Sequence, residues 1–133
     1  KITFINDSKA TSFDSTKYAL KNNKNIFWIL GGLPKVRDNF NFQGVRSNII
    51  KSFIIGKKTN YFKNQITKKI KYKISFSLKK AVKDVFKELV LMRGGNATVL
   101  FSPASASYDQ FNNFAERGNQ FKKITKDYAK KFL

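Results

Sequence analysis

The chain has 133 residues, of which 41% are hydrophobic and 26% charged, a size and balance that suit one globular domain and exclude a complete multidomain enzyme. The absence of cysteine and histidine excludes disulfide frameworks, cysteine proteases, typical zinc sites and Ser-His-Asp hydrolases within this chain. No stretch approaches the ~18 consecutive apolar residues of a membrane span, so we expect no membrane insertion. The sequence begins with Lys1 and enters a predicted strand at once, so we expect a piece of a longer protein.

The net charge of +19, taken alone, indicates a partner such as nucleic acid or an anionic membrane surface. Lysine outnumbers arginine by 23 to 4, however, and the abundant Lys, Asn, Ile and Phe all have codons rich in A and T. Genomic base composition can therefore produce this charge without any binding function. Arginine, which makes bidentate contacts to phosphate and guanine, is scarce, so we expect no specific nucleic-acid partner. A non-enzymatic basic domain that binds nucleic acid remains the alternative interpretation.

The chain alternates between short apolar segments typical of strands and segments with helical periodicity. Strands are predicted at Lys1–Asn6, Asn25–Leu30, Ile49–Ile55, Tyr72–Phe76 and Ala97–Phe101. Helices are predicted at Ser12–Asn22, Lys57–Lys68, Leu78–Met92 and Phe114–Phe132, and the loop before Ile49 has room for a short helix. This alternation predicts a three-layer, Rossmann-like α/β domain over residues 1–133, with a mainly parallel sheet flanked by helices.

The segment Leu78–Met92 has the clearest amphipathic pattern of the predicted helices. Its expected buried stripe consists of Leu78, Ala81, Val82, Val85, Phe86, Leu89 and Val90. Four lysines lie on the opposite side, at positions 79, 80, 83 and 87. We therefore interpret this lysine run as a solvated helix face.

Function in a parallel sheet is expected at the carboxyl ends of the strands, where loops lead into helix N-termini with free N–H groups and partial positive charge. Three predicted loops qualify: Asn6–Thr11, Gly31–Lys35 and Ser102–Gln110. The cations of Lys9 and Lys35 and the hydroxyls of Thr11 and Ser107 would then form a pocket suited to a small dianion such as a dicarboxylate. No residue there has an ordinary pKa near 7, so we expect a binding half-site whose chemistry is supplied from elsewhere.

Each of these loops also has a purely structural interpretation. Thr11 with Asp14, and Ser107 with Gln110, match capping-box spacings, so both hydroxyls could simply cap helices. The other residues of the pocket each have an ordinary structural role: Gly31 and Gly32 as the exit from a strand, Asp7 as a turn residue, and Lys9 and Lys35 as surface cations. The convergence of these groups at one edge of the sheet favours binding.

Three segments together resemble a known family: Phe4–Thr11 (FINDSKAT), Ile29–Lys35 (ILGGLPK) and Val99–Phe121 (VLFSPASASYDQFNNFAERGNQF). In order and spacing they resemble the C-terminal domain of the UDP-N-acetylmuramoyl-L-alanine:D-glutamate ligases, a branch of the Mur ligase family. Asp7 is followed by Ser-Lys-Ala-Thr, as in the glutamate-adding branch, whereas sister ligases carry tyrosine and histidine or asparagine there.

The resemblance implies an ATP-dependent amide-forming reaction in the cytoplasm. ATP phosphorylates the carboxylate of UDP-N-acetylmuramoyl-L-alanine, and the amine of D-glutamate attacks the resulting acyl phosphate. It further implies that Lys35 and Thr11 hold one glutamate carboxylate and that Ser107 and the backbone at Tyr108 and Phe114 hold the other. By the same resemblance, Asp7 would contact the ATP ribose, and Lys9 would stabilise the reacting phosphoryl group.

In the family that this chain resembles, the P-loop and the magnesium ligands belong to a central ATPase domain, and this chain carries neither. We therefore expect ATP and Mg²⁺ to be bound mainly outside residues 1–133. The domain alone should be inactive and hold no metal. We expect it to be a monomer whose partners are its own N-terminal UDP-binding domain and central domain.

Overall fold

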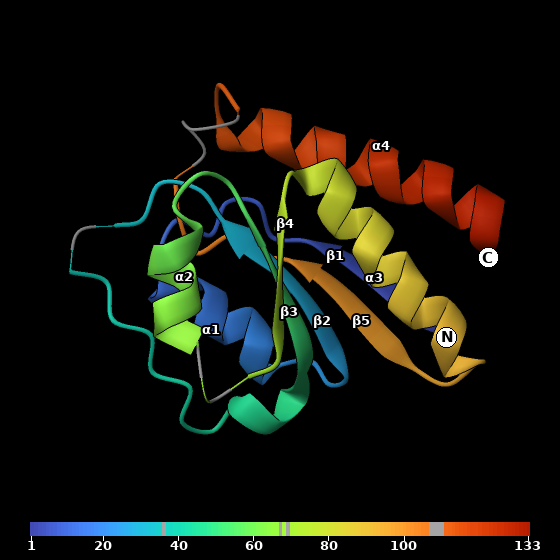
Figure 1. Cartoon of the computed structure of the whole chain (residues 1–133), viewed down its shortest axis with the longest axis horizontal. Helices are drawn as coiled ribbons and strands as arrows, with labels where there is room; N and C mark the ends of the chain where they lie inside the picture. Colours follow the sequence, from blue (N-terminus) through green and yellow to red (C-terminus); the bar gives the residue numbers. More distant parts are fainter. Residues whose placement is uncertain (36, 67, 69, 107–110) are drawn as a thin grey trace.

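The computed structural model of the chain describes residues 1–35, 37–66, 68, 70–106 and 111–133. These residues form a five-stranded parallel sheet with the strand order β1-β5-β2-β3-β4 (Figure 1). The strands are β1 (Ile2–Asn6), β2 (Ile26–Gly31), β3 (Ile49–Ile55), β4 (Tyr72–Phe76) and β5 (Ala97–Phe101). The helices are α1 (Phe13–Lys21), α2 (Thr59–Ile66), α3 (Leu78–Met92) and α4 (Phe114–Phe132), with a 3₁₀ helix η1 (Arg46–Asn48) before β3.

The predicted α/β fold with a parallel sheet is confirmed. The bounds of β3, β4, β5, α3 and α4 are those predicted, and the other elements differ by one or two residues at their ends. The short helix η1 occupies the loop before β3. Within the described ranges, no helix has both the length and the apolar character needed to cross a bilayer.

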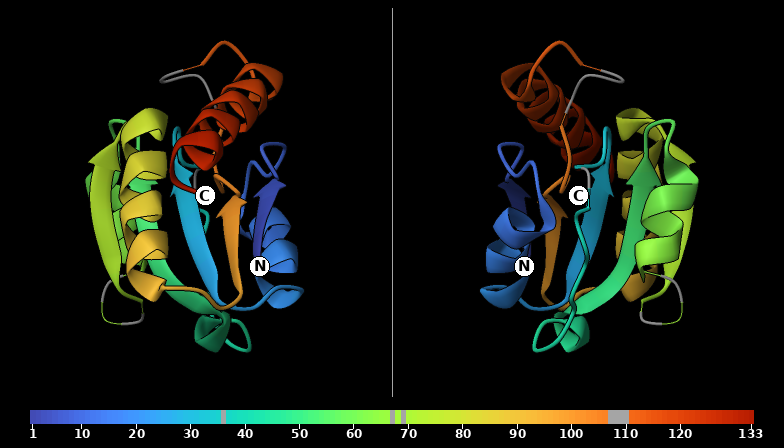
Figure 2. Two further views of the ribbon diagram at one scale, coloured as in Figure 1. Left: turned by 90° about the vertical axis from the view of Figure 1, so that its right-hand side faces the viewer. Right: turned by 90° about the vertical axis from the view of Figure 1, so that its left-hand side faces the viewer.

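Helices cover both faces of the sheet (Figure 2). All six residues of β2 are buried, and successive side chains point to opposite faces. Trp28 therefore belongs to the core packed under α1 and α2, whereas Phe27 belongs to the core packed under α3 and α4. Burial on both faces explains why β2 is a continuous apolar run rather than an alternating pattern.

The segment between β2 and η1 completes the core on the α1 side with aromatic rings. Phe40 and Phe42 are buried, and their ring centroids lie 4.5 and 5.0 Å from that of Phe13. The Tyr61 hydroxyl of α2 donates to the backbone carbonyl of Asp38 at 2.8 Å. The sequence predicts no core role for this segment, because no helical or strand periodicity marks its apolar residues.

Helix α3 contains a buried carboxylate that its sequence pattern does not reveal. Asp84 is 2% exposed, accepts a hydrogen bond from Ser75 Oγ at 2.8 Å and forms ion pairs with Lys80 and Lys73. Burial by itself would raise the pKa of this carboxyl, but the hydrogen bonds from Lys80, Ser75 and Lys73 together hold the pKa below its ordinary value. Asp84 therefore fastens α3 to the neighbouring strand β4.

One residue of the predicted buried stripe of α3 is not buried. Val90 is 52% exposed, and it faces a hollow that opens between the last turns of α3 and α4. The helical period places Val90 on the inner side of α3, but the position of α4 leaves this part of that side uncovered.

Candidate functional site

The predicted site lies at the edge of the sheet where the parallel strands end. Strand β5 lies between β1 and β2 in the sheet. The chain leaving β1 leads to α1 on one face, whereas the chain leaving β5 leads to α4 on the other face (Figure 2). In open α/β sheets, ligands usually bind at the place where the chains that leave two neighbouring strands go to opposite faces of the sheet.

Asp7 follows β1 and is held by the chain that leaves β5. Ser102 Oγ donates to Asp7 Oδ2 at 2.6 Å and lies 2.8 Å from Thr16 Oγ1 of α1. The Ser102 carbonyl accepts a hydrogen bond from Trp28 Nε1 at 2.7 Å, which fixes it against β2. Burial raises the pKa of Asp7, and the hydrogen bond from Ser102 offsets only part of that rise. The Asp7 side chain is therefore fixed by tertiary contacts and is not merely a local turn residue.

The loop after β2 is joined to the loop after β5 by backbone hydrogen bonds. Gly31 N donates to the Pro103 carbonyl at 3.0 Å, and Leu33 and Ala106 exchange two hydrogen bonds of 2.9 Å. The joined loops carry Lys35, whose side chain is exposed.

Two glycines, Gly31 at the end of β2 and Gly32 directly after it, allow close approaches of the backbone here. Gly31 and Gly32 have φ angles of +130° and +141°, a region that other residues rarely adopt. A Cβ atom on Gly31 would lie 2.0 Å from the Ile55 carbonyl oxygen, and one on Gly32 would lie 2.4 Å from that of Ala106. Gly32 is therefore required by the contact between the loops, and Gly31 by the close approach of β2 to β3.

The residue that caps the N-terminus of α1 is not the one that the sequence spacing suggested. Ser12 is the N-cap and accepts a hydrogen bond from Ser15 N at 3.4 Å, so the capping role considered for Thr11 is wrong. Thr11 lies one residue earlier with its side chain exposed, where its hydroxyl can face a ligand. No sequence pattern singles out Asp38, whose carboxylate accepts a hydrogen bond from Phe13 N at 2.8 Å. This N–H of α1 is therefore already used by the protein.

Arg117, in the first turn of α4, is a residue of this edge that was not predicted from the sequence. It is 1% exposed, and its Nε and Nη2 atoms donate to the Ser8 carbonyl at 3.0 and 2.8 Å. Nη2 also donates to the Ser105 carbonyl at 2.7 Å. Arg117 thus holds the loop after β1 and the loop after β5 to the same helix. Its signal in the sequence is an arginine in a chain rich in lysine, because the planar guanidinium holds several N–H donors in a fixed fork that suits two carbonyls.

Two of the predicted ligands, Ser107 and Tyr108, lie outside the described residues, as does the considered cap of Ser107 with Gln110. Phe114 is the first residue of α4, and Asn113 is the N-cap. The backbone N–H of Phe114 therefore belongs to the first turn, where helical N–H groups lack intrahelical partners.

The structure thus brings the partly buried Asp7 and the loops that carry Lys9, Thr11 and Lys35 to one edge of the sheet. The side chains of Lys9, Thr11 and Lys35 are exposed there, which suits the binding of anionic groups. Across the described ranges, no group of three or more Asp or Glu residues comes close enough to hold a metal ion. The edge offers positive charge and hydrogen bonds but no histidine or cysteine to move a proton.

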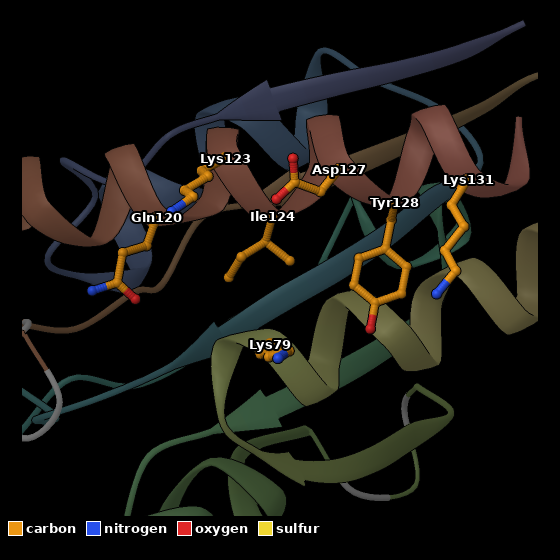
Figure 3. Close-up of a pocket in the computed structure, with 7 residues that line it drawn as sticks. All are labelled: Lys79, Gln120, Lys123, Ile124, Asp127, Tyr128 and Lys131. Atoms are coloured by element: carbon orange, nitrogen blue, oxygen red, sulfur yellow. The ribbon is translucent and has the colours of Figure 1, made fainter.

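A separate hollow of about 690 Å³ lies between α3 and α4, away from these loops (Figure 3). Its lining includes Lys79 from α3 and Ile124, Asp127, Tyr128 and Lys131 from α4. No function is predicted for these residues from the sequence.

The comparisons with known proteins identify similar sequences over almost the whole chain. It is 37% identical over 123 residues to the UDP-N-acetylmuramoylalanine–D-glutamate ligase of Nitrobacter winogradskyi, an alignment that covers 92% of this chain and 26% of that protein. The ligases of the same name from Rhizobium meliloti and Bartonella henselae are 36% and 38% identical over 121 and 120 residues. Those alignments cover 91% and 90% of this chain. The chain spans about a quarter of the length of these curated relatives. A scan of protein-family models found no match.

Proposed function

Since the chain belongs to the family of UDP-N-acetylmuramoylalanine–D-glutamate ligases and spans about a quarter of the length of these relatives, we propose that it is the C-terminal, D-glutamate-binding domain of such a ligase. Its partner domains would be an N-terminal UDP-binding domain and a central ATPase domain outside residues 1–133. The observation that carries this proposal is the junction of three loops at one edge of the sheet, since these loops belong to the segments that resemble the family.

Within this proposal, the loops after β1 and β2 bind one carboxylate of D-glutamate. Lys35 supplies a charge-assisted hydrogen bond, and the exposed Thr11 hydroxyl supplies a second one. Ser107 and the backbone N–H groups of Tyr108 and Phe114 bind the other carboxylate. The position of Phe114 at the start of α4 supports this role, because a helix N-terminus favours negative charge.

Asp7 and Lys9 would interact with ATP rather than with D-glutamate. The Asp7 carboxylate is held in one orientation by Ser102, which suits a hydrogen bond to a ribose hydroxyl of ATP. Lys9 follows two residues later with its side chain exposed, where it can offset negative charge on the phosphoryl group being transferred. ATP phosphates and Mg²⁺ would be bound mainly by the central domain, since no acidic cluster for a metal forms within the described residues.

The proposed reaction is the formation of an amide bond at the expense of ATP. The γ-phosphoryl group of ATP is transferred to the carboxylate of UDP-N-acetylmuramoyl-L-alanine. The amine of D-glutamate then attacks the acyl carbon, a proton leaves the nitrogen, and inorganic phosphate departs. The residues of this chain contribute by orienting the amine and by offsetting negative charge, which can lower the barrier without proton transfer from the domain itself.

The alternative function, binding of nucleic acid by a basic domain, finds no support in the three relatives, because each is named as a ligase. The charge of +19 alone does not favour it over a lysine-rich composition.

A substitution in the full-length ligase tests the proposed glutamate site. Lys35→Ala should raise the KM for D-glutamate by about 10- to 150-fold, because one charge-assisted hydrogen bond contributes about 1.5–3 kcal/mol. The KM for ATP should change little. Lys21→Ala removes an exposed lysine at the far end of α1 and should leave both constants unchanged. Equal effects of Lys35→Ala on the two substrates would show that Lys35 only supports its loop.

A further inference from the structure

Large apolar side chains are exposed together where α3 and α4 end. Val90 and Leu91 in the last turn of α3 are 52% and 76% exposed, and Phe132 and Leu133 at the end of α4 are 49% and 62% exposed. Single exposed apolar residues are common on protein surfaces, whereas a cluster of this kind marks an interaction surface. We refer to these four residues as the apolar tip.

A hollow of about 640 Å³ extends from the apolar tip between the two helices. It is lined by Phe86 of α3 and Tyr128 of α4, whose ring centroids are 5.5 Å apart. The ring of Tyr128 also stacks on that of Phe132, with centroids 5.8 Å apart and planes 18° apart. The hollow therefore has aromatic walls that are already in contact with each other, and it shares Tyr128 with the neighbouring hollow in Figure 3.

The charged side chains that line the hollow beside the apolar tip are positive. Lys83, Lys87 and Lys131 line the hollow, and no carboxylate is among its lining residues. Arg93, which caps α3, and Lys130, in the last turn of α4, add two more exposed cations nearby in sequence. Asp127 is one turn earlier on α4 and lines only the neighbouring hollow. An apolar surface bordered by cations is complementary to a surface that is apolar inside and anionic at its boundary.

The apolar tip lies at the opposite end of the sheet from the candidate functional site. Helix α3 connects the carboxyl end of β4 to the amino end of β5, so it ends at the amino edge. Helix α4 ends on the same side of the molecule (Figure 1). A partner bound to the apolar tip would therefore leave the loops that follow β1, β2 and β5 open to substrate.

We propose that the apolar tip and its lysines are a docking surface for a membrane that contains anionic phospholipids. The four apolar side chains enter the boundary between headgroups and acyl chains, part of an acyl chain enters the hollow, and Lys83, Lys87 and Lys131 contact lipid phosphates. A partner helix lying in the hollow would cover Val90, Leu91 and Phe132, which line it, but not Leu133 or the cations of Arg93 and Lys130. A bilayer would meet all of these together. This is contact from one side of the bilayer, so it requires no spanning helix.

The lack of cysteine allows a direct test in this chain, because Leu91→Cys can carry a single environment-sensitive fluorophore such as nitrobenzoxadiazole. Vesicles of phosphatidylcholine with about 30% phosphatidylglycerol are added at about 150 mM salt, at which nonspecific surface electrostatics are partly screened. The proposal expects a blue shift and brighter emission from the label. Tyr18→Cys is the matched control, since Tyr18 is also 76% exposed but lies on α1, on the other face of the sheet. Its emission should not change.

A second pair of variants separates the proposed surface from the overall positive charge. Replacing Lys83, Lys87 and Lys131 by glutamine should weaken vesicle binding at least about tenfold, since each lysine near an anionic surface contributes measurably. Replacing Lys21, Lys58 and Lys68 by glutamine gives the same net charge and should weaken binding less than about threefold. Circular dichroism of each variant checks that the fold is retained.

Three results would overturn the proposal. The first is equal weakening of vesicle binding by the two triple variants, which would assign binding to the overall charge. The second is vesicle binding without any response of the label at position 91. The third is a response of that label to a glutamate-rich amphipathic peptide but not to vesicles, which would assign the surface to an acidic protein partner instead.

Discussion

Asp7 illustrates at the scale of one residue how a group with a proposed binding role can oppose stability. Its carboxylate is desolvated, and its pKa in the folded chain is raised despite the hydrogen bond from Ser102. Above both the folded and the unfolded pKa, the charged form therefore favours the unfolded chain. This destabilisation disappears as the pH falls through the folded pKa, because the folded chain then takes up the proton.

Asp7→Asn should therefore increase the free energy of unfolding at neutral pH, since the amide keeps an acceptor for Ser102 without the buried charge. The increase should shrink as the pH falls through the raised pKa of Asp7 in the folded chain, because the carboxyl of the unmodified chain then becomes protonated. Denaturant unfolding at several pH values measures this difference. Asp127→Asn, at an exposed site on α4, serves as the control and should change stability little. A loss of stability in Asp7→Asn at neutral pH would contradict the expected cost of the desolvated charge.

Arg117 is the second residue on which the candidate site depends, because it links Ser8 and Ser105 through their carbonyls. Arg117→Lys keeps the charge, but an ammonium group cannot reproduce the fork that serves both carbonyls. An unsatisfied buried carbonyl should lower the free energy of unfolding by about 1–3 kcal/mol. Lys122→Ala, at an exposed position of the same helix, should change it by less than about 0.5 kcal/mol. Unfolding curves that coincide for Arg117→Lys and the unmodified chain would show that the link is dispensable.

At the scale of elements, the site depends on how closely the loop after β2 approaches its neighbours. The backbone of this loop is bonded to Pro103 and Ala106 beyond β5. Gly31, which ends β2, and Gly32, the first residue of the loop, both have positive φ, and neither has room for a Cβ atom. The strand order, which puts β5 beside β2, is what makes this contact possible.

Two glycine substitutions distinguish the effect of this contact from the effect of backbone conformation. Gly44 has a φ of +80°, and a Cβ atom added there would meet no atom within 4 Å, so Gly44→Ala should cost about 1–2 kcal/mol for conformation alone. Gly32→Ala adds a clash with the Ala106 carbonyl and should cost at least about 1–3 kcal/mol more. Thermal unfolding of both variants measures the difference. Similar melting temperatures would show that the loops can separate without loss of stability.

At the scale of the whole molecule, the domain is a binding half-site under the proposed function. It presents exposed lysines and a hydroxyl at one sheet edge, and it contains no phosphate-binding glycine-rich loop with a lysine of the P-loop type. The amino acid would be brought by this domain, and the nucleotide phosphates by another.

The purified 133-residue chain should therefore neither hydrolyse ATP nor join D-glutamate to UDP-N-acetylmuramoyl-L-alanine. Supplying the central and N-terminal domains in the same polypeptide should restore ligation, because the acyl phosphate and the amine would then meet in one site. Phosphate release and product formation, each compared with a mock preparation, measure the two activities. ATP turnover by the chain alone would contradict the proposed division of roles.

The local patterns of the sequence determined the order of the elements, the bounds of five of them and the parallel α/β class, because helix and strand periodicities act over neighbouring residues. They also located the three loops of the candidate site, since in a parallel sheet every strand ends at the same edge. The resemblance to the UDP-N-acetylmuramoylalanine–D-glutamate ligases was recognisable from short segments such as Asp7–Thr11, whose residue types form a specific combination.

Tertiary structure alone decided which residues hold those loops in place. Arg117 meets Ser8 across 109 positions of the chain, and Ser102 meets Asp7 across 95, distances over which no local periodicity carries information. The hydrogen bond between Asp38 and the N-terminus of α1 also joins residues that are far apart in the chain, so no local pattern predicts it. The exposure of Val90 likewise depended on the position of α4, because a residue's side of a helix is set by the helical period but its burial is set by what packs against that side.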